Sequence, residues 1–60
     1  MGTFVIEVEI TGRSNIKYHR LVEVDASNEA EAMIVARDEA YDMLPDAISV
    51  EPLYITEQLA

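Results

Sequence analysis

The side chains that could do chemistry are few in this sequence, and none has the spacing of a catalytic site. His19 is the one histidine, and cysteine is absent. Each of the three serines has a structural explanation in a turn, a helix cap or a strand start: Ser14, Ser27 and Ser49. Catalysis needs a nucleophile beside a base, paired carboxylates in a pocket, or a bound metal. The sequence therefore predicts no catalytic residue, no cofactor and no enzymatic activity.

Carboxylates are the largest chemically active group. Asp38 and Asp42 are spaced i, i+4, so they share one face of a helix, and Glu31 precedes them on that face. Calcium sites gather six or more oxygens from a folded loop, which a straight helix face does not provide. We predict no metal site. Two interpretations remain open, a solvated face that only aids solubility and a row of carboxylates that meets a basic protein surface.

The second interpretation predicts a partner-binding surface on the helix, with Val35 as its central apolar contact. Its residues are Glu31, Val35, Asp38, Glu39 and Asp42.

The net charge of −8 at pH 7 comes from 12 acidic and 4 basic residues and is unevenly distributed. Residues 1–22 carry a net charge of +1 and residues 23–51 a net charge of −8. An acidic segment of this kind repels nucleic acid phosphates and anionic lipid. No apolar run approaches the roughly 20 residues of a membrane span. We therefore expect a soluble, cytoplasmic protein that binds neither nucleic acid nor membrane directly.

The hydrophobic pattern predicts a hairpin first. Residues 3–11 alternate between apolar and polar side chains, as in a strand with one buried face, and residues 16–25 alternate again with Arg20 interrupting the apolar face. Between them, residues 12–15 form a turn cluster in which Gly12 and Asn15 both tolerate positive φ.

A helix follows the hairpin. Asn28 and Glu31 have the spacing of a capping box, and Pro45 ends the helical pattern. The apolar arc expected to face the sheet consists of Ala30, Met33, Ile34, Ala36, Ala40, Tyr41, Met43 and Leu44.

The pattern of residues 47–56 predicts a third strand. Its apolar residues change from even to odd positions at Pro52, a change of parity that predicts a bulge or kink there. With the first strand in the centre, the strand order is 2-1-3. The predicted class is α+β: one ββαβ domain over residues 1–60, with an antiparallel sheet covered on one face by the helix.

One helix leaves the other face of the sheet open, and that face is a second candidate interface. Its expected residues are Val5, His19, Leu21, Leu53 and Ile55, the last two depending on the bulge. Exposed apolar patches commonly mark interfaces. The competing hypothesis is therefore a structural module that homodimerises through this open sheet face, with the charge serving only solubility.

The order of elements also carries a resemblance. Two strands, the segment 24–32 with its Glu-Ala-rich helix start, the Met43-Leu44-Pro45 turn and a closing strand are similar to small phage proteins. They look most like the small inhibitor of host RNA polymerase made by short-tailed coliphages. That family has arginines near its third strand that matter for binding, whereas residues 47–60 here contain neither Arg nor Lys. The resemblance implies a phage-encoded inhibitor that binds a host enzyme, and it implies no site residue.

Overall fold

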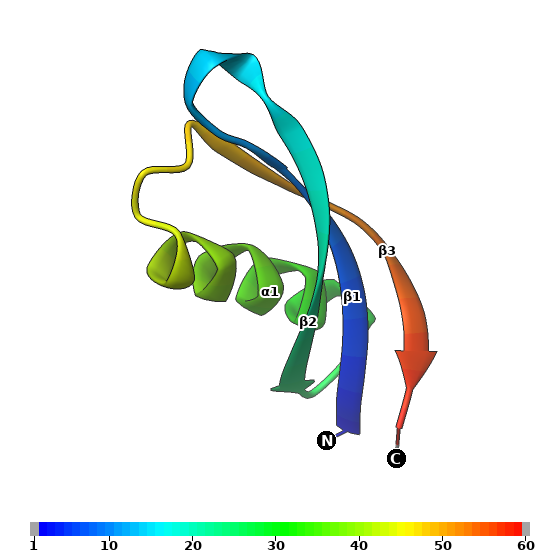
Figure 1. Ribbon diagram of the computed structural model, residues 1–60. Coiled ribbons are helices and arrows are strands. Elements are labelled where there is room, and N and C mark those ends of the chain that lie inside the picture. The colour runs from blue at the N-terminus through cyan, green and yellow to red at the C-terminus, as the bar shows by residue number, and fades with distance from the viewer. Residues whose placement is uncertain (1, 60) are drawn as a thin grey trace.

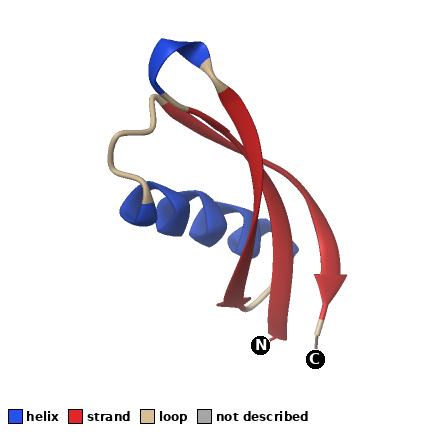
Figure 2. Ribbon diagram, viewed as in Figure 1, coloured by secondary structure: helices blue, strands red, loops and turns tan. Residues whose placement is uncertain are grey.

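The computed structural model describes residues 2–59 and has three strands and one helix (Figures 1 and 2). In chain order these are β1 (Gly2–Thr11), β2 (Lys17–Ala26), α1 (Glu29–Met43) and β3 (Ser49–Gln58), with a single 3-10 turn, η1 (Arg13–Asn15), between the first two strands. The strands form one antiparallel sheet in the order β2-β1-β3. The predicted class and strand order are confirmed.

The hairpin of β1 and β2 is regular throughout. Ten consecutive residue pairs join the two strands, from Gly2 opposite Ala26 to Thr11 opposite Lys17. At the turn, Ser14 and Asn15 adopt φ values of 62° and 60°. The left-handed region expected at Asn15 is confirmed, but Gly12 has a φ of −94° and Ser14 takes the second left-handed position.

β3 contains the expected irregularity, and there are two shifts in place of one. Pro52 lies opposite Val8 and Tyr54 opposite Glu7, so Leu53 is the extra residue of a bulge. A second shift leaves Thr56 unpaired in the ladder, and its hydroxyl donates a hydrogen bond to the carbonyl oxygen of Val5 at 3.1 Å. The parity change read from the sequence at Pro52 is therefore a bulge.

The start of α1 follows the capping-box pattern. The Asn28 side-chain oxygen accepts a hydrogen bond from the Glu31 backbone N–H at 2.9 Å. In return, the Glu31 carboxylate accepts one from the Ser27 N–H at 3.0 Å. These two bonds satisfy donors that would otherwise be unpaired at the helix start, and they fix where the helix leaves β2.

The helix buries a narrower and differently placed face than the sequence predicted. Its buried residues are Ala32, Ala36 and Ala40, one turn apart, while Ile34 is 54% exposed. The strands supply the large core side chains: Phe4, Ile6, Val8, Ile10, Val22, Val24 and Val50. Because these β-branched and aromatic side chains already fill the space above the sheet, the helix approaches through its alanines. The expected arc, which placed Ala30 and Ile34 against the sheet, was wrong by a rotation of the helix, whereas Met43 lies on the alanine side and is 52% exposed as the last residue of α1.

The helix covers only part of the sheet. Figure 1 shows α1 crossing one face near the end where the two chain termini lie, while the hairpin turn projects beyond it. Along the covered face of β2, Val22, Val24 and Ala26 are accordingly buried, whereas Tyr18 and Arg20 are exposed. The molecule is elongated, at 37 × 17 × 15 Å. No helix within residues 2–59 is long and apolar enough to span a membrane.

Candidate binding surfaces

The first candidate surface is the acidic helix face, which we define as Glu31, Asp38, Glu39 and Asp42. All four residues are exposed. At about 100° per residue, Asp38 lies within about 20° of Glu31 and about 40° of Asp42, and Glu39 lies further round toward the sheet. Three of the four predicted carboxylates thus share one direction.

The contacts of these carboxylates differ. The carboxylate of Glu31 is engaged in the helix cap, and Asp38 pairs with the neighbouring Arg37 at 3.5 Å. Neither Glu39 nor Asp42 makes an ion pair with any residue from 2 to 59. The Asp42 carboxylate is therefore available to a partner, and it lies on the same side of the helix as Asp38.

Val35 does not lie where the sequence predicted. It is half-buried and packs against the hydrophobic core, because the rotation of the helix turns it toward the sheet. The exposed apolar side chain beside the carboxylates is Ile34. An apolar contact residue of this face would therefore be Ile34, which borders Asp38 on the side away from Glu39, a side that the sequence analysis assigned to the core.

The second candidate surface is the open sheet face, whose side chains form rows across the three strands. Directly opposed residues of an antiparallel pair point to the same side. The rows on this face, written from β2 to β1 to β3, are His19–Glu9–Glu51, Leu21–Glu7–Tyr54 and Glu23–Val5–Glu57. Leu21 is 61% exposed and Tyr54 is 53% exposed. The face thus combines two large exposed side chains with carboxylates on every strand.

Ile55 and Leu53 behave differently from the expectation for this face. Ile55 lies opposite Ile6, a fully buried residue, and packs against the core on the helix side. Leu53 is half-buried at the bulge. Because the bulge shifts the parity of β3, Tyr54 takes the position on the open sheet face that the sequence analysis left to Ile55. The change of apolar parity at Pro52 was the sequence feature that could have placed Tyr54 on this face.

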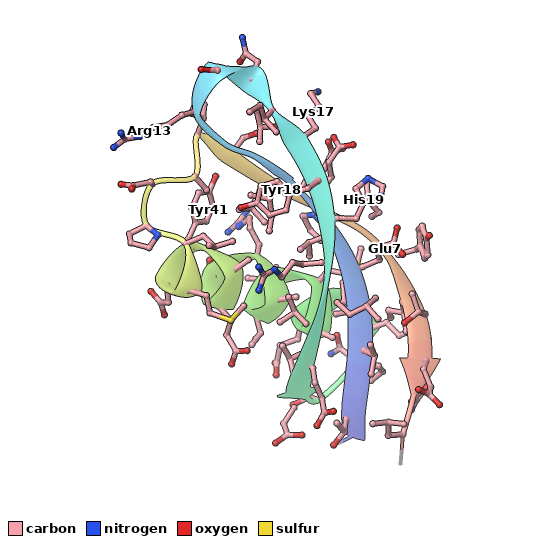
Figure 3. All side chains as sticks on the ribbon, viewed as in Figure 1. Glu7, Arg13, Lys17, Tyr18, His19 and Tyr41 are labelled. Carbon is pink, nitrogen blue, oxygen red and sulfur yellow. The ribbon has the colours of Figure 1, made fainter. Side chains whose placement is uncertain are left out.

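The centre of the open sheet face is an ion cluster around His19 (Figure 3). Its Nδ1 lies 2.9 Å from Oε2 of Glu7, and its Nε2 lies 3.3 Å from Oε2 of Glu9. The Lys17 ammonium lies 3.9 Å from the other oxygen of Glu9. A neutral imidazole has a single N–H, so both contacts are hydrogen bonds only when the ring is protonated.

The cluster shifts the pKa of two groups. The hydrogen bond to Glu9, together with the contact and charge of Glu7, raises the pKa of His19 above its ordinary value of 6.5 and outweighs the opposing effect of desolvation. Hydrogen bonding to Glu7 and the charge of that carboxylate raise the pKa of Tyr54 above 10.0. The arrangement favours the protonated form of His19 between two carboxylates. A shallow hollow borders it, lined by Glu7, His19, Arg20 and Leu21.

A further hollow of about 390 Å³ lies between the hairpin turn and the loop after α1. Arg13 and Asp46 form an ion pair across its rim at 3.6 Å, and Tyr18 and Leu44 are among its lining residues. Figure 3 shows Tyr18 and Tyr41 directed toward this side of the sheet. The Tyr41 hydroxyl accepts a hydrogen bond from the Val50 N–H at 3.1 Å, so its role is to join α1 to β3.

Within the part of the chain that the structure describes, no three His, Cys, Asp or Glu side chains are grouped so that they could hold a metal ion. No family model, no curated protein and no solved structure matches this chain.

Proposed function

We propose that this chain is a non-catalytic binding domain that docks its acidic helix face on a basic surface of a nucleic-acid-handling enzyme. The observation that carries the proposal is the exposure of the carboxylates on α1, with Arg37 as the one cation that pairs with them among residues 2–59. Opposite charges on two surfaces speed association and select the partner. Ile34, 54% exposed beside these carboxylates, would supply an apolar contact at the border of this face.

The kind of partner follows from the charge. Enzymes that handle nucleic acids present clustered Lys and Arg side chains to the phosphates. A protein with a net charge of −8 complements such a surface. A protein bound there would exclude the nucleic acid, which is inhibition by occupation. The resemblance to the small phage inhibitors of host RNA polymerase supports this class of activity and a site of action in the host cytoplasm.

The test is a matched pair of charge-reversed variants. In Asp38→Lys/Asp42→Lys the acidic helix face is reversed, and in Glu51→Lys/Glu57→Lys two carboxylates of β3 are reversed with the same change in net charge. Immobilised wild type should capture basic nucleic-acid-handling proteins from a bacterial lysate. The purified partners should bind the β3 variant within about threefold of wild type and the helix variant at least about tenfold more weakly, the loss of about 1.4 kcal/mol of binding free energy. Equal capture by both variants, or capture of no such protein by wild type, contradicts the proposal.

A structural module that homodimerises through the open sheet face is the second candidate. The exposure of Leu21 and Tyr54, side chains that flank Glu7 in one row of this face, favours it. Both side chains would be buried in a dimer formed face to face. Sedimentation of wild type and of Tyr54→Glu at high concentration tests this candidate, because a charge at Tyr54 would split a face-to-face dimer and Tyr54 lies on β3, away from the β2 edge.

A further inference from the structure

The two outer strands of the sheet differ in the edges that they present. The ladder of β3 is interrupted by two register shifts, and Pro52 has no N–H to donate, both of which prevent another strand from pairing along that edge. β2 pairs with β1 over ten consecutive residues without a shift, and it contains neither proline nor glycine. The β2 edge is therefore long and regular, without the proline and the bulges that interrupt β3, although it carries the charged side chains of Lys17 and Arg20.

We propose that two copies of this chain pair antiparallel along their β2 edges, about a two-fold axis centred on Leu21. In this register Lys17 of one copy lies opposite Asp25 of the second copy, and His19 lies opposite Glu23 of the second copy. The symmetry repeats each pair, so two Lys17–Asp25 pairs and two His19–Glu23 pairs flank the axis, and the latter are oppositely charged when His19 is protonated. The two sheets join into one continuous six-stranded sheet.

The charges select this register. If one β2 strand is shifted by two residues in one direction, Arg20 of one copy lies opposite Arg20 of the second copy, and the two like charges repel. The same shift places His19 opposite Leu21. A shift in the other direction leaves Lys17 without an opposed residue in β2 and places Leu21 opposite Glu23. Since like charges directly opposed destabilise a strand pair and opposite charges stabilise it, the register centred on Leu21 is favoured.

Leu21 occupies the axis itself. Its side chain is 61% exposed in the single chain. In the paired sheet it lies directly beside its own copy, where the two Cβ atoms of opposed residues are about 5 Å apart. The two leucines would cover one another on the open sheet face. The pairing accounts for an exposed leucine in the middle of an otherwise charged row of β2.

The other face of β2 has a matching asymmetry. Tyr18 and Arg20 lie beyond the end of the helix and are exposed, whereas Val22 and Val24 are buried beneath it. The register centred on Leu21 places Tyr18 opposite Val24 and Arg20 opposite Val22 of the second copy. Each copy thus brings its helix-covered segment beside the bare segment of the other.

Cysteine cross-linking tests the axis, because wild type contains no cysteine. Under mild oxidation Leu21→Cys should form a disulfide-linked dimer, since opposed residues of an antiparallel pair have Cα distances within the range that a disulfide spans. Val5→Cys is the control: it lies on the same face of the central strand, where a face-to-face dimer would cross-link it. Cross-linking of Val5→Cys without Leu21→Cys overturns the proposal.

Charge exchange tests the register in solution. Sedimentation velocity should show dimers of wild type, with dissociation about tenfold easier in Lys17→Glu and in Asp25→Lys, since each change affects two pairs per dimer. The double variant Lys17→Glu/Asp25→Lys restores opposite charges and should dimerise within about threefold of wild type. Thermal unfolding of each variant establishes that it is folded.

A wild type that stays monomeric at about 1 mM, a concentration at which a free energy of about 4 kcal/mol suffices for pairing, overturns the dimer. A dimer that the single variants leave unchanged, or that the double variant does not restore, overturns the register. The acidic helix face takes no part in these pairs. The dimer and the proposed function can therefore fail separately.

Discussion

At the scale of single residues, His19 is the side chain whose state is most constrained. It bridges Glu9 on one nitrogen and Glu7 on the other. Both bonds require the imidazolium, so the folded protein holds the proton more tightly than the unfolded chain. Because the sequence has one histidine, an NMR titration reports on His19 alone, and we expect it to give a pKa above 6.5 for that side chain. Glu9→Gln should lower it, while Glu57→Gln on β3 should leave it unchanged.

The same shift predicts how stability depends on pH. Because the folded-state pKa lies above the unfolded value, protonated His19 stabilises the fold fully below pH 6.5, and that contribution is lost as the pH rises through the folded-state pKa. His19→Gln should remove this part of the pH dependence in thermal unfolding. A pKa at or below 6.5, or one insensitive to Glu9→Gln, contradicts this account of the cluster.

At the scale of elements, the alanine line of α1 determines how closely the helix packs. Ala36 is fully buried at its centre, whereas Ala30 is exposed. Ala36→Leu should lower the free energy of unfolding by about 1–3 kcal/mol, because a larger side chain has no space between helix and sheet. Ala30→Leu, the matched control, should change it by no more than about 0.5 kcal/mol. Denaturant unfolding measures both, and equal effects would contradict this orientation of the helix.

The elements themselves were predictable because each has a local cause. Two alternating segments, the Asn28–Glu31 capping box and Pro45 give two strands, a helix start and a helix end without knowledge of the rest. The orientation of the helix was not predictable from its own residues. An arc that contained Ile34 is the more apolar choice, but the sheet already fills the core with side chains such as Ile6 and Ile10. The space that remains between the sheet and α1 accommodates alanine side chains.

The candidate surfaces were predictable to the extent that they depend on those elements. Asp38, Asp42, His19 and Leu21 are exposed as expected, since their places follow from helix and strand periodicity. Tyr54 replaces Ile55 on the open sheet face because the extra residue at the first bulge changes the parity of Tyr54 and Ile55, and the second shift restores the parity from Glu57 on. The sequence indicated the bulge at Pro52 and left its consequence open.

At the scale of the whole molecule, charge is separated along the long axis. The cations Arg13, Lys17 and Arg20 lie at the hairpin end, which projects beyond the helix. Carboxylates dominate the opposite end, where Glu23, Asp25 and Glu57 lie on outer strands. The acidic end sets the sign of the long-range field, so a basic partner approaches that end and the helix first.

The excess of negative charge also predicts how the fold responds to salt. A net charge of −8 on 60 residues destabilises the compact state by self-repulsion. The ion pairs that salt would weaken, such as Arg13–Asp46 and Lys17–Glu9, are solvent-exposed and contribute little. Repulsion among the excess carboxylates therefore outweighs the attraction within these ion pairs. Raising NaCl from about 10 mM to about 1 M, which shortens the Debye length from about 30 Å to about 3 Å, should raise the midpoint of thermal unfolding.

The size of that rise should follow the net charge. Glu51→Lys/Glu57→Lys halves the charge to −4, because each substitution adds two positive charges to the −8 of wild type. Its midpoint should lie above that of wild type at low salt, and it should rise less on addition of NaCl. NaCl is the right salt because sulfate also strengthens hydrophobic burial. If the variant and wild type rise equally, or if wild type falls, then local ion pairs govern the stability of this fold and the separated charge does not.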